Sequence, residues 1–90
     1  MMNFIISNEA KKHLIRLYKG QALRIYPKVK TWAGITYQLV QDEPKTGDNL
    51  YEVEGLRFVI NKNEEKEVSF VEIDYENDWS GESFIITAGF

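Results

Sequence analysis

The sequence predicts an α+β fold, with one N-terminal helix packed on a curved, mostly antiparallel β assembly. One apolar stripe lies near the start of the chain, where Ala10, Leu14, Leu17 and Tyr18 recur at helical spacing. After this stripe, apolar and polar residues alternate in short runs, which is typical of strands. A hydrophobic fraction of 43% with 13% aromatic residues is too high for a disordered chain. We therefore expect residues 1–90 to form a single small domain.

The helix has recognisable ends. A short strand, Phe4–Ile6, leads into Ser7, whose hydroxyl is a good N-cap. At the other end, Lys19 is followed by Gly20, a residue that favours helix termination. The helix is expected to run from Ser7 or Asn8 to about Lys19.

The rest of the chain is predicted to be mostly strand. In the first strand, over residues 22–29, Pro27 cannot donate a ladder hydrogen bond, which indicates a strand edge or end. Further elements are a turn over 31–34, a strand over 35–40, a loop over 42–49, a hairpin of 50–53 and 56–60 around Glu54-Gly55, a loop or helical turn over 61–67, and strands over 70–75 and 84–87. The residues expected in the core include Leu14, Leu17, Leu23, Ile25, Leu39, Val59, Ile73 and Phe84.

Charge and composition exclude several classes of protein. The net charge of −3 argues against a general nucleic-acid binder, which needs a basic patch to displace phosphate counterions. A small basic stripe of Lys19, Arg24, Lys28 and Lys30 is conceivable, but ordinary solubilising charge is the stronger interpretation. No apolar run approaches a membrane span, and the first residues do not resemble a signal peptide. With no cysteine to form a disulfide, the expected location is the cytoplasm.

Several short segments fall in the order and approximate spacing of a known family. They are Leu23-Arg24-Ile25, Gly34-Ile35-Thr36-Tyr37-Gln38-Leu39, Asp42-Glu43-Pro44, Gly47-Asp48, Glu52, Gly55 and Ile73-Asp74-Tyr75. With these segments the chain resembles the HesB/IscA-like iron–sulfur cluster biosynthesis domain over almost its whole length. The resemblance implies a small β-rich scaffold, which in that family holds iron or a cluster on three cysteines.

The family's three cysteines are missing from this chain. A family segment resembling Gly-Gly-Cys-Ser-Gly-Phe-Ser-Tyr corresponds to residues 30–37, where Gly34 and Tyr37 match and Trp32 stands in the place of the first cysteine. The other two cysteines form a Cys-Gly-Cys near the family's C-terminus, and no such pair precedes Phe90. Since an indole offers no lone pair to a metal, the resemblance implies a cysteine-free, degenerate member. We expect no cofactor, unless the family function persists without cysteine.

Four carboxylates form the other candidate site. Glu72, Asp74, Glu76 and Asp78 alternate with apolar residues, so a continuous strand would place all four on one face, about 6.5–7 Å apart. Oxygen ligands of this kind suit hard divalent cations. A solvated outer face is the stronger interpretation of the row.

Large aromatic residues stand out in polar surroundings. Trp32 lies in a predicted turn, whose local structure does not require a large aromatic side chain, and Tyr37 lies nearby in sequence. Trp79 and Tyr26 are further outliers. Trp32 can fill the space of the lost cluster or anchor a partner, because exposed tryptophan is enriched at interface hot spots. We hypothesise a contact region around Trp32 and Tyr37.

Two functions remain open. The first is a non-catalytic module that acts by contact with a protein partner or with itself, and the second is weak iron or divalent-cation binding through carboxylates. An enzyme has almost no support, because His13 is the only histidine and no serine has a nucleophile motif. His13 is expected to flank the core beside the apolar stripe.

Overall fold

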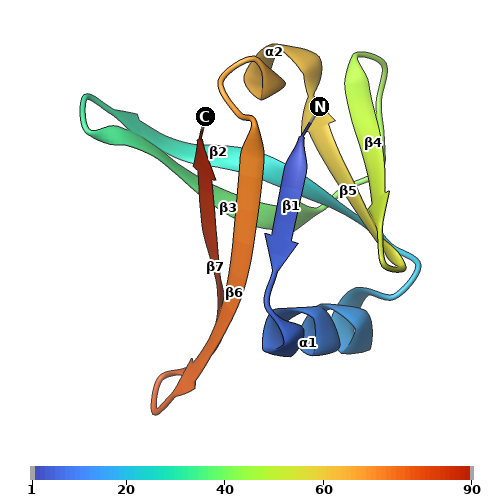
Figure 1. Ribbon diagram of the computed structural model, residues 1–90, viewed down its shortest axis with the longest axis vertical. Coiled ribbons are helices and arrows are strands. Elements are labelled where there is room, and N and C mark those ends of the chain that lie inside the picture. The colour runs from blue at the N-terminus through green and yellow to red at the C-terminus, as the bar shows by residue number, and fades with distance from the viewer. Residues whose placement is uncertain (1, 90) are drawn as a thin grey trace.

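Two mixed β-sheets and one three-turn helix make up the structure, a computed structural model that describes residues 2–89 (Figure 1). The strands are β1 (Asn3–Ile6), β2 (Ala22–Thr31), β3 (Gly34–Gln41), β4 (Asp48–Val53), β5 (Leu56–Asn61), β6 (Phe70–Asp78) and β7 (Gly81–Gly89). The helices are α1 (Asn8–Tyr18) and the single turn α2 (Lys62–Glu65). The predicted α+β class is confirmed, and the segment left open as a loop or a helical turn is a helical turn.

Each sheet combines parallel and antiparallel neighbours. The first has the order β1-β6-β7 and the second the order β3-β2-β5-β4. The pairs β2–β3, β4–β5 and β6–β7 are antiparallel hairpins, whereas β1–β6 and β2–β5 are parallel. The expected assembly was mostly antiparallel, and the two parallel pairings were not anticipated. Tight turns reveal hairpins in a sequence, but they carry no information about strands that pair across long stretches of chain.

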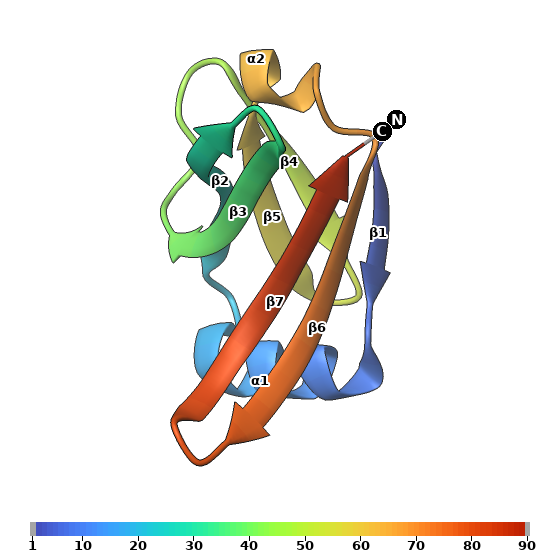
Figure 2. The ribbon, with the colours of Figure 1, turned by 90° about the vertical axis from the view of Figure 1, so that its left-hand side faces the viewer.

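Helix α1 lies across one end of the two sheets (Figures 1 and 2). The Ser7 hydroxyl oxygen accepts a hydrogen bond from the Ala10 N–H at 3.1 Å, which caps the first turn. At the far end, Gly20 has a φ of +80°, a left-handed conformation that glycine adopts without strain. The helix therefore begins and ends within one residue of the expected range.

The core lies between the two sheets and under α1. Leu14, Leu23, Ile25 and Ile73 are at most 1% exposed and belong to one apolar cluster, as predicted. Leu39 and Phe84 are half-buried and pack against the same cluster. The other buried members of the cluster include Ala10, Tyr37, Leu56, Phe58, Ile60, Val68 and Val71.

One predicted core position, Leu17, is exposed, and another, Val59, is buried as predicted but on the other face of its sheet. The prediction that Leu17 is buried is wrong, because its side chain is 37% exposed. The buried side of α1 runs through Ala10 and Leu14, with Tyr18 beyond them. Val59 is fully buried, but it pairs with Arg24 and lies outside the apolar cluster. It therefore packs beneath the polar face of the second sheet.

Pro27 lies inside β2 and not at its end. Strand β5 accompanies β2 only from Ala22 to Arg24, so at Pro27 one side of β2 has no strand beside it. A β-bulge follows between Pro27 and Val29. Beyond this point β2 and β3 continue alone as a two-stranded arm, hereafter the β2–β3 arm, which projects from the body of the fold (Figure 1).

Candidate functional site

The tip of the β2–β3 arm presents a fully exposed tryptophan. Thr31 and Gly34 are the last paired residues, and between them the Trp32 side chain is 100% exposed. The Thr31 hydroxyl closes the turn, since it accepts from the Ala33 N–H at 3.2 Å and donates to the Gly34 carbonyl at 3.3 Å. The interpretation of Trp32 as a core filler is therefore wrong, and the indole is free to contact another molecule.

Tyr37 does not share this surface. It pairs with Pro27 further down the arm, is only 6% exposed and belongs to the core cluster. Burial raises the pKa of its phenol, with smaller contributions from the nearby Glu67 and Glu64. The exposed neighbours of Trp32 are instead Lys28, Val29 and Lys30.

A second exposed tryptophan marks the other long hairpin. Trp79 is 98% exposed at the turn between β6 and β7. The Asp78 carboxylate holds this turn, because its Oδ1 accepts from the Ser80 N–H at 2.8 Å and from the Ser80 hydroxyl at 2.6 Å. Those two bonds hold the pKa of Asp78 below its usual value. Both tryptophans of the chain thus stand at hairpin tips.

The four predicted carboxylates occupy one exposed face of β6. Glu72, Asp74, Glu76 and Asp78 are all exposed, while the alternate residues Val71 and Ile73 are buried. Within residues 2–89, no three His, Cys, Asp or Glu side chains gather closely enough to hold a metal ion. The structure therefore places the four acids on one face without bringing them to one coordination site.

His13 packs against the core edge. Its imidazole stacks on the Tyr75 ring, with the ring centres 3.9 Å apart and the planes 12° from parallel. Its Nδ1 lies 2.9 Å from Arg16 Nη2, and its Nε2 lies 3.6 Å from a Glu9 carboxylate oxygen. These contacts agree with the position beside the apolar stripe that the sequence indicates.

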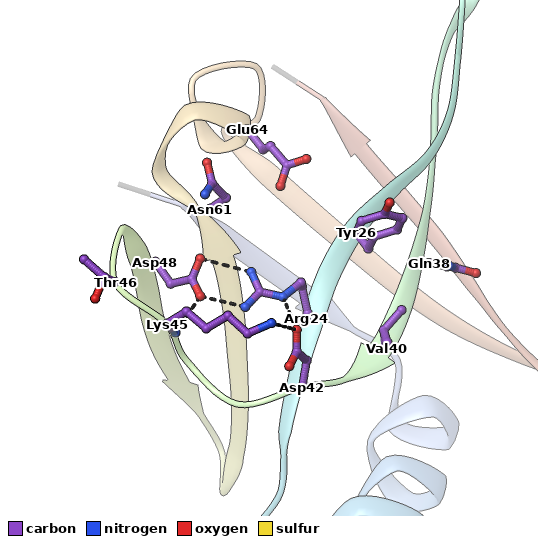
Figure 3. Close-up of a pocket in the computed structure, with 10 residues that line it drawn as sticks. All are labelled: Arg24, Tyr26, Gln38, Val40, Asp42, Lys45, Thr46, Asp48, Asn61 and Glu64. Carbon is purple, nitrogen blue, oxygen red and sulfur yellow. Dashed lines mark hydrogen bonds and ion pairs between the residues drawn. The ribbon is translucent and has the colours of Figure 1, made fainter.

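A cavity with a volume of about 510 Å³ lies on the polar face of the second sheet (Figure 3). Tyr26 and Val40 form part of its wall on β2 and β3, and Glu64 lines it from α2. At its base the Arg24 guanidinium lies between Asp42 and Asp48 (Figure 3). The sequence indicates a possible basic stripe or ordinary solubilising charge at Arg24, and the structure corrects both interpretations, because the residue is buried.

The Arg24 guanidinium is fully engaged by its own chain. Its Nε donates to Asp42 at 2.8 Å, and its two terminal nitrogens donate to the two Asp48 oxygens at 3.0 and 2.6 Å. A weaker bond of 3.4 Å reaches the Glu43 carbonyl. The Asp48 side chain is only 3% exposed, and it also accepts from the Lys45 N–H at 2.8 Å.

The charges of this cluster stabilise one another. The bonds to Arg24 hold the pKa of both carboxyl groups below its usual value, and Asp48 in turn raises the pKa of Arg24. Since its N–H groups are directed at these internal acceptors, Arg24 has little capacity to bind an external anion. The cluster therefore fastens the loop over residues 42–47 to β2, and its role is structural.

The sequence matches no protein-family model and no curated protein. Among solved structures, IscA with its 2Fe–2S cluster superimposes with a TM-score of 0.75 at 22% identity, over 94% of this chain and 84% of that one. Escherichia coli SufA, involved in the biosynthesis of iron–sulfur clusters, gives a TM-score of 0.71 at 21% identity, over 94% and 79% of the two chains. A protein from Aquifex aeolicus gives 0.66 at 24% identity, over 97% and 94%.

The chain has the HesB/IscA-like fold. At these identities the likeness concerns the fold, and the chemistry has to be argued from the residues present. The HesB/IscA-like resemblance places the first family cysteine at the tip of the β2–β3 arm, where this chain carries Trp32. Within residues 2–89, no helix is both long and apolar enough to cross a membrane.

Proposed function

We propose that this chain is a non-catalytic HesB/IscA-like module that works by protein contact through the tip of its β2–β3 arm. The observation that carries the proposal is the indole of Trp32, whose exposed fraction is 100%. An exposed tryptophan on a closed, hydrogen-bonded turn has the rigidity and the apolar area of an interface hot spot. The cytoplasmic location and the single-domain organisation remain predictions.

The residues present support contact better than ligation. The 90 residues contain no cysteine, so the thiolate ligands on which iron–sulfur clusters depend are not available within them. The arm tip is a closed hairpin turn, with Gly34 at a φ of +139°. We infer that the position of the family's first ligand now serves recognition.

A photo-crosslinker at position 32 tests this proposal. Benzoylphenylalanine would replace Trp32 in cells that produce the protein, and covalent adducts would be identified by mass spectrometry. The matched control carries the same group at Lys62, an exposed position in α2. Adducts formed from position 32 and not from position 62, with this chain or with another protein, are expected. Equal labelling from both positions would contradict a contact role for the tip.

The runner-up function is weak binding of iron or another divalent cation by the β6 carboxylates. Its support is limited to the shared face of Glu72, Asp74, Glu76 and Asp78, which would have to move to converge on one ion. A calorimetric titration with ferrous iron under reducing conditions separates the two functions. Heat that is lost in Asp74→Asn would favour the metal, while no heat above dilution would leave the contact function alone.

A further inference from the structure

The two long hairpins of this chain carry opposite charge. Residues 22–41, which form β2 and β3, include Arg24, Lys28 and Lys30 and no acidic residue. Residues 70–89, which form β6 and β7, include five acidic residues and no basic one. Such a separation of sign within a chain of net charge −3 creates two surfaces that attract each other.

The acidic surface is one face of the sheet β1-β6-β7. Strand pairing sets Ile5 beside Glu72 and Ile85 beside Asp74 on this face. The two isoleucines are 52% and 45% exposed, which is high for aliphatic side chains in neighbouring strands. This outer face, made by the four β6 acids with Ile5 and Ile85, therefore offers both apolar area and negative charge.

The tip of the β2–β3 arm matches that surface in both respects. Lys28 and Lys30 supply positive charge, and the fully exposed Trp32 supplies apolar area. Beyond the bulge between Pro27 and Val29 the arm has no strand on the β5 side, so about three residues of β2, or roughly 10 Å of strand, project toward a partner.

These charges form no ion pairs within residues 2–89. No ion pair of the described chain includes Lys28, Lys30 or any of the four β6 acids. The fifth acid of the hairpin, Glu82, is different, because it pairs with Arg16 at 3.0 Å and accepts from the Tyr75 hydroxyl at 2.8 Å. The two tip lysines and the four β6 acids are thus available for ion pairs with another molecule.

Within one molecule, the tip of the β2–β3 arm cannot contact the outer face of the β1-β6-β7 sheet. The β2–β3 arm belongs to the sheet on the other side of the core, and β3 lies close to β7. The β6 acids point away from that core, since the alternate residues Val71 and Ile73 of the same strand point into it. Contact between tip and outer face therefore requires a second molecule.

We propose that the Trp32 tip of one copy docks on the outer face of the β1-β6-β7 sheet of a second copy. Lys28 and Lys30 lie against the β6 acids, and the indole lies against Ile5 and Ile85. This inference rests on the proposed contact function and names its partner as the same chain. Because tip and face are different surfaces, two copies either exchange both contacts reciprocally in a dimer or continue as a chain of molecules.

A charge-swap pair tests the contact by sedimentation. The tip variant carries Lys28→Glu and Lys30→Glu, and the face variant carries Glu72→Lys and Asp74→Lys. Each variant on its own brings like charges together at the contact between its copies, so the dissociation constant of its self-association should rise at least about tenfold over wild type. In an equimolar mixture both contacts have opposite charges again, and association should return to within about threefold of wild type.

Three controls accompany the swap. Lys12→Glu with Lys66→Glu changes the net charge as the tip variant does, but at exposed positions away from both surfaces, and should leave association unchanged. Trp32→Ala should weaken association about thirtyfold, which corresponds to a hot spot of about 2 kcal/mol. Salt raised from about 0.05 to 0.5 M should weaken the wild-type contact about tenfold. Circular dichroism and thermal midpoints verify that every variant is folded.

Several results would overturn the inference. A wild-type protein that stays monomeric up to about 1 mM has no such contact, and a mixture that associates no better than its components shows that the two surfaces do not meet. If a variant does not fold, the crosslinker at position 32 decides, since its self-adducts must map to β1, β6 or β7. Adducts with another protein alone would contradict self-docking and keep the contact function. If position 32 gives no specific adducts, both the self-docking and the proposed contact function are contradicted.

Discussion

The Arg24 guanidinium and the Asp48 carboxylate form a two-pronged ion pair, with nitrogen–oxygen distances of 3.0 and 2.6 Å. The pair joins the start of β2 to the start of β4, two strands that are not neighbours in their sheet. Val59 of β5, which lies between these strands, is fully buried next to Arg24. The ion pair therefore spans the middle strand and covers its polar side.

Removal of one partner of this pair should be costly. Arg24→Met leaves the 3%-exposed Asp48 carboxylate without its counter-charge, and the free energy of unfolding should fall by about 3 kcal/mol. Urea denaturation measures the change. The double variant Arg24→Met/Asp48→Leu has no stranded charge and should recover a large part of the loss. A double variant less stable than Arg24→Met would show that the charge is not the cause.

Stability should fall on acidification through the same cluster. The pKa values of Asp42 and Asp48 lie below their usual range in the folded protein, so in acid the unfolded chain binds more protons than the folded one. The resulting stabilisation is present above the unfolded pKa of about 3.9 and is lost as the pH falls below it. Urea midpoints at descending pH should drop more steeply for wild type than for Asp48→Asn. Parallel profiles would contradict this role for Asp48.

Two leucines of α1 should respond differently to truncation. Leu14 is fully buried, so Leu14→Ala should lower the free energy of unfolding by about 2–5 kcal/mol. Leu17 is 37% exposed, and Leu17→Ala should lower it by less than about 1 kcal/mol. The two variants make the same chemical change three residues apart and control each other. Equal losses in chemical denaturation would show that the buried face of the helix is misplaced.

Reconstitution with iron and sulfide should leave the protein colourless. Cluster iron prefers thiolate ligands, and the 90 residues contain none. The protein would be incubated anaerobically with both ions, desalted and examined by absorption spectroscopy, with IscA treated identically as the positive control. A charge-transfer band that survives desalting would mean that other residues of this chain hold a cluster.

Local patterns were enough to place most elements. The apolar stripe with Ser7 and Gly20 at its ends located α1, and the residues at turns located the β2–β3 and β4–β5 hairpins. The turn between β6 and β7 was not predicted, and both strands extend further toward it than expected. The alternation in β6 placed its four acids on one exposed face. These features depend on neighbouring residues alone, which is why a single sequence suffices to find them.

Features that depend on distant residues were not found. Arg24 looked like surface charge, although a regular hairpin with its turn at Trp32-Ala33 sets Gln41 opposite Arg24 and Asp42 opposite Leu23. The bulge between Pro27 and Val29 shifts this register by only one residue, so Asp42 lies near Arg24 in either case. That register, followed back from the turn, could have indicated an ion pair. The proximity of Asp48 to Arg24 depends on β5. This strand joins β2 in a parallel pairing, which no tight turn in the sequence indicates.

The parallel pairing of β1 with β6 constrains the order in which this chain can fold. Asn3 lies opposite Phe70, so the first strand has no partner until most of the chain has been synthesised. Until then β1 must leave a ribosome unpaired, with Phe4, Ile5 and Ile6 exposed to chaperones and to other nascent chains. Contacts between such distant residues slow folding, typically to milliseconds or seconds. The three local hairpins can form first, and the arrival of β6 beside β1 then completes the molecule.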